Sequence, residues 1–192
     1  MTYSPRFEAA LIYATHVHAG QVRKATRIPY ITHLMGVAAL VAEYGGDEDQ
    51  VVAALLHDAP EDQGGAGRLE DIRVRFGETV ARIVAACSDT FEDPKPAWRP
   101  RKEAYLAHLK SAPMEVLLVS AADKLHNARA IVADLRQTGA AAFERFTGKA
   151  AGTLWYYDAL AQEFEARCPG PLAAELLRVV RELHRLAGAG GA

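Results

Sequence analysis

A run of six apolar residues, Val51–Leu56, is followed at once by the acidic string His57–Asp62. The spacing around this run predicts a helix over Glu48–Asp58, and a helix that is apolar nearly all round belongs in the centre of a fold. We expect Pro60 to end this helix, because proline disfavours helical backbone at the residue before it. The chain must therefore bury one helix completely and place a cluster of ionisable groups at its end.

Helical spacing continues along most of the chain, where Ala, Leu, Glu and Arg are abundant and strand-like alternation is rare. A first helix is expected after the cap and proline Ser4-Pro5, and loops are expected over 21–29 and 63–67. Further helices are predicted over 30–44, 69–76, 78–87, 101–110, 114–137, 148–167 and 172–186. The pattern predicts an all-α, compact single-domain bundle of about eight to ten helices over 1–187, with a disordered tail over 188–192.

Composition limits the location and the partners of the chain. The formal net charge is −2, so no global basic field favours binding to a nucleic-acid polymer. No apolar stretch is long enough to span a membrane, and the N-terminus does not have the pattern of a signal peptide. Cys87 and Cys168 lie outside any metal-type spacing and are expected to be reduced thiols. We therefore expect a cytoplasmic protein without a membrane partner, and its oligomeric state stays open.

The ionisable groups at the end of the buried run favour a metal site. Buried charges need partners, and a divalent cation is an effective one. Adjacent side chains on a helix point about 100° apart, so His57 and Asp58 can reach one ion only near a helix end. His33, beside the apolar stripe of the preceding helix, and Asp123, which interrupts an apolar helix, complete a set of two imidazoles and two carboxylates. This set suits Mn²⁺ or Fe²⁺, with Zn²⁺ as a further alternative.

Each of these residues has a plainer interpretation when it is taken alone. A single helix histidine such as His33 is more often a hydrogen-bonded structural residue. A single aspartate such as Asp123 is more often paired with a lysine, here Lys124. The combination of His33 and Asp123 with the string HDAPED is what favours the metal.

Four segments together resemble the HD superfamily of metal-dependent phosphohydrolases: HAGQVRKATRIPYITH, AALLHDAPED, RLEDIRVRFGETVARIVAACSD and SAADKLHNAR. The His, His-Asp pair and distant Asp of that superfamily are matched by His33, His57, Asp58 and Asp123. The resemblance is closest to the hydrolase domains of RelA/SpoT proteins and to the stand-alone small alarmone hydrolases. It implies an HD-type helical fold and Mn²⁺-dependent removal of the 3′-pyrophosphate from (p)ppGpp, the alarmone of the stringent response.

The same resemblance assigns catalytic roles to the acidic pair Glu61 and Asp62. A divalent ion lowers the pKa of a water that it holds, and a carboxylate just outside the ligands can take the proton. We expect Glu61 to be the general base and Asp62 to be its partner. The alternative is a solvated acidic loop.

Five residues match positions that face the substrate in the family. Arg23 and Lys24 would contact phosphate, for which the forked donors of arginine are suited. Asn127 would lie near the sugar, and either Tyr156 or Tyr157 would contact the nucleotide. The alternatives are a solvated basic loop for the first pair and core packing for the two tyrosines.

Three positions depart from the family's usual residues and lie around the substrate rather than at the metal: Leu34, Arg27 and Gln63. Because of these departures, three functions remain open. The first function is hydrolysis of (p)ppGpp with release of pyrophosphate and GDP or GTP. The second is hydrolysis of another nucleotide, such as a 5′-nucleotide or the 2′-phosphate of NADPH. The third is a non-catalytic nucleotide-binding HD domain.

Overall fold

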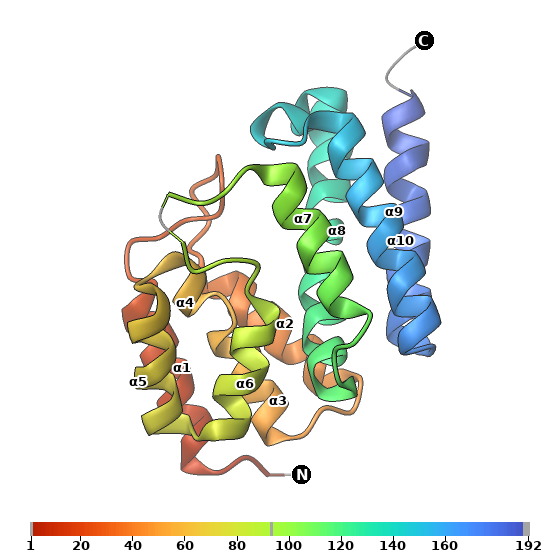
Figure 1. The fold of residues 1–192 in the computed structure, drawn as a ribbon. Helices are drawn as coiled ribbons and strands as arrows, with labels where there is room; N and C mark the ends of the chain where they lie inside the picture. The colour runs from red at the N-terminus through yellow and green to blue at the C-terminus, as the bar shows by residue number, and fades with distance from the viewer. Residues whose placement is uncertain (1, 93, 190–192) are drawn as a thin grey trace. The chain divides into compact units, whose positions relative to one another are not determined.

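A computed structural model describes residues 2–92 and 94–189 of the chain. In chain order the helices are α1 (Pro5–Val17), α2 (Ile31–Glu43), α3 (Glu48–Leu56), α4 (Ala59–Asp62), α5 (Gly65–Phe76), α6 (Glu78–Cys87), α7 (Trp98–Leu109), α8 (Met114–Thr138), the 3₁₀ helix η1 (Gly139–Arg145), α9 (Lys149–Arg167) and α10 (Pro171–Ala189) (Figure 1). Extended pairing within the described residues amounts to an isolated antiparallel bridge between Val22 and Pro29. The prediction of an all-α fold is confirmed.

The chain divides into two compact units. The first comprises residues 1–96 and 112–122, and the second comprises 97–111 and 123–192. The boundary of the predicted domain at residue 187 stays a prediction. Of the predicted tail, residues 188 and 189 belong to α10, and 190–192 lie outside the described residues.

Helix α3 is the centre of the first unit. Its apolar residues Val51–Leu56 are all buried, and the helix packs against α1, α2 and α6 (Figure 1). Asp47 and Gln50 form a reciprocal cap at its start, where each side chain accepts a 2.9 Å hydrogen bond from the backbone N–H of the other. Such a cap fixes where the helix begins. The expected burial of this helix is confirmed.

The segment after α3 differs from the sequence prediction. Helix α3 ends at Leu56, and Pro60 lies in the first turn of α4 instead of ending a longer helix. Proline is tolerated at this position because the N–H that it lacks has no partner within the helix. The loop expected over 63–67 is also shorter, because α5 begins at Gly65. Gly64 has φ 118°, a left-handed conformation that favours glycine, so the turn between α4 and α5 is built on this residue.

The second unit is a helical layer in which α9 packs against α7, α10 and η1. Trp98, at the start of α7, lies against Gly148, where an added Cβ would approach the indole to 2.7 Å. Arg99 covers the ring of Trp155, with its guanidinium carbon 3.3 Å from the ring centroid. The sequence prediction did not include η1. Across the described residues, none of the helices combines the length and the apolar character that crossing a bilayer requires.

Candidate metal centre

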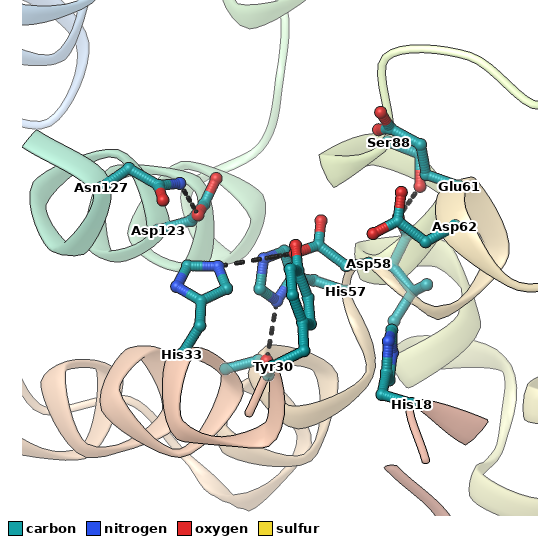
Figure 2. Close-up of polar contacts among 12 residues, drawn as sticks. His18, Tyr30, His33, His57, Asp58, Glu61, Asp62, Ser88, Asp123 and Asn127 are labelled. Carbon is teal, nitrogen blue, oxygen red and sulfur yellow. Dashed lines mark hydrogen bonds and ion pairs between the residues drawn. The ribbon is translucent and has the colours of Figure 1, made fainter. Parts of the chain in front are cut away.

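His33, His57 and Asp58 converge in the first unit (Figure 2). His33 lies in the first turn of α2, and His57 and Asp58 lie between the end of α3 and the start of α4. One potential ligand atom from each residue lies within 4.8 Å of the others. Both imidazoles are almost fully buried, with exposures of 1% and 2%. The break between α3 and α4 allows the adjacent His57 and Asp58 to face one point, as the sequence predicted.

The hydrogen bonding of His57 is compatible with a cation shared by His57 and Asp58. Its Nδ1 donates a 2.8 Å hydrogen bond to the carbonyl oxygen of Ala54, because a carbonyl can only accept. The other nitrogen of the neutral ring, Nε2, then carries a lone pair, and it lies 3.1 Å from Oδ2 of Asp58. Two electron pairs at that distance repel each other unless a proton on Nε2 or a metal ion supplies positive charge. The donor set of two imidazole nitrogens and a carboxylate therefore fits a divalent metal ion.

Tyr30 orients the carboxylate of this cluster, and sequence reasoning did not assign it a role. Its hydroxyl donates a 2.7 Å hydrogen bond to Oδ2 of Asp58, the oxygen that lies 3.5 Å from Nε2 of His33. Its ring stacks on His18 and meets the His33 ring edge-on. The available signal was its position at the start of a predicted helix, three residues before His33.

The acidic pair belongs to the four-residue helix α4. Glu61 accepts a 2.9 Å hydrogen bond from Nζ of Lys95 and a 3.2 Å hydrogen bond from the backbone N–H of Asp89. Asp62 accepts a 2.9 Å hydrogen bond from Nε2 of Gln21, and Lys95 lies 3.4 Å from its other oxygen. Lys95 and Gln21 were not identified by sequence reasoning, because each meets the pair only through the fold.

The electrostatics of Glu61 suit a proton acceptor. Burial raises the pKa of its carboxyl, and the negative charges of Asp89 and Asp58 raise it further, while Lys95 opposes the shift. A general base works best when its pKa approaches the working pH. This direction agrees with the role expected for Glu61, which itself stays a prediction.

The basic residues of the loop before α2 lie on a tight turn. The backbone N–H of Arg23 donates a 2.8 Å hydrogen bond to the carbonyl of Ile28, which closes the turn. The guanidinium of Arg23 lies 5.7 Å from the ring centroid of Tyr30, and Lys24 is exposed. Substrate binding by Arg23 and Lys24 stays a prediction.

The second unit contains the remaining predicted site residues. Asp123 is buried and accepts a 2.7 Å hydrogen bond from Nζ of Lys124. It also accepts a 2.6 Å hydrogen bond from Nδ2 of Asn127 (Figure 2). The lysine partner that the plainer interpretation of Asp123 required is thus present. Tyr156 and Tyr157 are both buried, at 6% and 7% exposure, which agrees with core packing. Metal binding by Asp123 and substrate binding by Asn127 and the two tyrosines stay predictions.

Comparison with known proteins relates the chain to a family and to a fold. The family model described as "HD domain" matches residues 10–149. The bifunctional (p)ppGpp synthase/hydrolase SpoT of Escherichia coli is 34% identical over 141 residues, which are 68% of this chain and 19% of that protein. The guanosine-3′,5′-bis(diphosphate) 3′-pyrophosphohydrolase MESH1 of Xenopus tropicalis is 38% identical over 130 residues, which are 64% of this chain and 70% of that protein. This chain therefore spans about a fifth of the length of SpoT.

Two solved structures have a similar fold. The structure of a metazoan ortholog of SpoT matches with a TM-score of 0.76 and 24% identity, over 97% of this chain and 99% of that one. The structure of lmo0812 from Listeria monocytogenes matches with a TM-score of 0.70 and 29% identity, over 82% of this chain and 99% of that one. The expected fold class is therefore found in solved structures as well.

Proposed function

We propose that this chain, which belongs to the HD domain family, is a metal-dependent hydrolase that removes the 3′-pyrophosphate from guanosine-3′,5′-bis(diphosphate). The observation that carries the proposal is the cluster of the buried His33 and His57 with the half-buried Asp58, and Glu61 follows Asp58 by three residues. Support for the substrate comes from the relatives, since MESH1 is named for this reaction and SpoT is named as a synthase/hydrolase of (p)ppGpp.

The metal in the proposal is Mn²⁺, with Fe²⁺ and Zn²⁺ as alternatives, because mixed imidazole and carboxylate ligation suits all three ions. His33, His57 and Asp58 would hold it, and Asp123 is proposed as the fourth ligand on the sequence motif. A bound divalent ion supplies positive charge that acidifies a water and neutralises phosphate oxygens.

The protein groups then divide the remaining chemistry. Tyr30 holds the Asp58 carboxylate, and Nδ1–H of His57, bonded to the Ala54 carbonyl, fixes that ring. Glu61 takes a proton from the attacking water as the water oxygen bonds to the phosphorus next to the sugar. The bond from that phosphorus to the 3′ oxygen breaks, and the 3′ oxygen gains the proton that Glu61 gives up, so Glu61 returns to its ionised form. Water is consumed, and pyrophosphate is released together with GDP from ppGpp or GTP from pppGpp.

The substrate contacts in the proposal are Arg23 and Lys24 for phosphate, and Asn127 with Tyr156 or Tyr157 for the nucleoside. Arginine and lysine suit an anionic diphosphate because charge-assisted hydrogen bonds to phosphate are strong. A nucleotide of this kind occurs in the cytoplasm, so a cytoplasmic location is part of the proposal.

The deciding experiment incubates purified protein and Mn²⁺ with ppGpp, GTP and NADPH, and measures pyrophosphate and orthophosphate separately. We expect stoichiometric pyrophosphate and GDP from ppGpp, and loss of both products in the Asp58→Ala variant. Release of orthophosphate from GTP or NADPH without any pyrophosphate from ppGpp would show that the substrate is another nucleotide and not ppGpp. Absence of all products from protein shown to contain the metal would leave only a binding role.

A further inference from the structure

Gln21 lies between α1 and α2, and its backbone is held on both sides. Its N–H donates a 3.0 Å hydrogen bond to the carbonyl of His18, and its carbonyl accepts a 2.9 Å hydrogen bond from the N–H of Tyr30. The backbone of Gln21 is therefore fixed relative to the residue that orients the Asp58 carboxylate. This position gives its side chain a defined origin from which to reach α4.

The side chain of Gln21 makes three hydrogen bonds. Its Nε2 donates to Oδ2 of Asp62 at 2.9 Å, and its Oε1 accepts from Nε2 of Gln63 at 2.8 Å. The third contact joins the same Oε1 to Nδ1 of His18 at 2.7 Å. An ionised carboxylate can only accept, so the amide must turn its NH₂ group toward Asp62 and its oxygen toward the other two residues. Reversing the amide would turn its oxygen toward the Asp62 carboxylate and break that hydrogen bond.

The orientation of the amide determines the tautomer of His18. Since Oε1 of Gln21 is an acceptor, Nδ1 of His18 must carry the proton. The other nitrogen, Nε2, is buried and has no hydrogen-bond partner in the part of the chain that the structure describes, as expected for an unprotonated nitrogen. The His18 ring is 3% exposed and stacks on Tyr30 with the ring centroids 5.1 Å apart. Burial lowers the pKa of His18, which favours the neutral ring.

We propose that Gln21 is a positioning residue for the hydrolytic reaction, that it holds the Asp62 carboxylate in place, and that His18 fixes the orientation of the Gln21 amide. Asp62 needs such support because α4 is only four residues long and offers little rigidity of its own. Its other partner, Lys95, lies at the longer distance of 3.4 Å and is 39% exposed. The kinetic part of this inference rests on the proposed function, whereas the tautomer of His18 does not.

The first experiment compares Gln21→Leu with the matched control Gln162→Leu, which changes an exposed glutamine of α9. We expect Gln21→Leu to lower kcat by about 10- to 100-fold, the range found when an orienting contact is lost. KM and the affinity for Mn²⁺ should stay within about twofold of the unchanged protein, because no metal ligand or phosphate contact is removed. The control should keep kcat within about twofold.

The second experiment tests His18 through a pair of variants. His18→Asn places an amide NH₂ near the former Nδ1 and can still donate to Gln21, whereas His18→Phe keeps an aromatic ring against Tyr30 without any donor. We expect His18→Asn to retain most of kcat and His18→Phe to lose about tenfold, the lower end of the range for an orienting contact. A structural role alone predicts the opposite order, because phenylalanine preserves the packing better. Equal losses of kcat in the two variants would also show that His18 does not fix the orientation of the Gln21 amide.

A third measurement does not depend on any substrate. The ¹⁵N chemical shifts of histidine-labelled protein without nucleotide report the tautomer of each ring, and the His18→Asn variant identifies the His18 signals. We expect His18 to be the Nδ1–H tautomer in the unchanged protein and to lose this preference in Gln21→Leu. An Nε2–H tautomer in the unchanged protein would overturn the hydrogen-bond assignment even if ppGpp is not the substrate.

The kinetic outcome separates this inference from the proposed function. If the unchanged protein releases pyrophosphate from ppGpp and Gln21→Leu does so at an equal rate, the positioning role is wrong and the function stands. If the unchanged protein hydrolyses a different nucleotide, the same comparison is made with that substrate. Should Gln21→Leu lose its cooperative melting transition, Gln21→Asn keeps the amide but is one methylene shorter, and the same loss of kcat is expected from it.

Discussion

Replacing Tyr30 with phenylalanine should weaken metal binding without unfolding the protein. The change removes one hydroxyl, which donates a 2.7 Å hydrogen bond to Oδ2 of Asp58. A hydrogen bond to a charged acceptor contributes about 1.5–3 kcal/mol. The Asp58 side chain is 20% exposed, so water can replace part of the lost contact and the lower end of that range applies. A loss of about 1.5 kcal/mol corresponds to about a tenfold rise in the Kd for the metal.

Titration calorimetry with Mn²⁺ on the apo-protein measures this change directly. The matched control is Tyr13→Phe, which removes a similar 2.6 Å hydrogen bond from a tyrosine to a carboxylate, Asp71, away from the metal cluster. We expect the control to leave the Kd for Mn²⁺ within about twofold and to change only the melting temperature. The aromatic contacts of residue 30 with His18 and His33 need only the ring, so they should survive the change.

Two results would refute the reasoning about Tyr30. An unchanged Kd for Mn²⁺ would mean that the hydroxyl does not orient the ligand. An equal loss in Tyr30→Phe and Tyr13→Phe would mean that metal affinity follows general stability rather than the hydrogen bond to Asp58.

Other substitutions test the charges around the proposed site. Lys95→Met removes the cation that lowers the pKa of Glu61, so this pKa should rise further. The acid limb of the pH profile of kcat/KM should then move to higher pH. A limb that does not move would show that Glu61 does not control it. Asp123→Asn should raise the Kd for Mn²⁺ by more than about tenfold if Asp123 is a ligand, and calorimetry that finds no change would exclude it. The melting temperature of this variant should also fall, since burial lowers the pKa of Lys124 and Asp123 is the largest of the opposing contributions that together raise this pKa. Arg23→Ala should raise KM about tenfold with kcat little changed, whereas Arg178→Ala, which changes an exposed arginine of α10, serves as the control and should change neither.

The centre of the first unit could be predicted because the signals were local. The run Val51–Leu56 is apolar on every side, so burial was its only stable outcome. His57 and Asp58 directly follow this run, and a break in the helix was needed for both to face one ion. His33 could be added because a histidine beside an apolar stripe is placed near the core by the helical period.

The segment after Asp58 was predicted less well because its signals have two meanings. Pro60 is compatible with the end of one helix and with the first turn of the next, and the sequence does not separate the two. Gly64 and Gly65 suggested a flexible loop, whereas the fold uses their left-handed conformations to turn directly into α5. Short helices of this kind depend on tertiary contacts more than on local propensity.

The partners of the acidic pair were missed for a different reason. Gln21 and Lys95 lie 41 and 33 residues from Asp62 in the sequence, and nothing in their local context distinguishes them from solvated side chains. Their role follows only from the packing that brings α1, α4 and the segment after α6 together in the first unit. Polar contacts between residues so far apart in the sequence produce no periodic pattern. The sequence therefore identified the two acids but not the residues that hydrogen-bond to them.

The environments of the two acids assign their roles and can be tested against each other. Burial and the charges of Asp89 and Asp58 oppose ionisation of Glu61, whereas Asp62 accepts from Gln21 and lies near Lys95. We therefore expect Glu61 to be the proton acceptor and Asp62 to be the orienting group.

Glu61→Gln should therefore lower kcat by about 10²–10⁴-fold, since a proton acceptor is removed. Asp62→Asn should lower kcat less, by about 10- to 100-fold, because the orienting charge is lost while its amide oxygen can still accept from Gln21. Glu61→Gln should also raise the melting temperature at pH 7. The raised pKa means that the folded protein favours the protonated acid, so ionisation of Glu61 costs stability above its unfolded pKa and has no effect well below it. A larger loss of kcat in Asp62→Asn than in Glu61→Gln would exchange the two roles. A lower melting temperature of Glu61→Gln at pH 7 would contradict the unfavourable environment of the ionised Glu61, on which its role as the base depends.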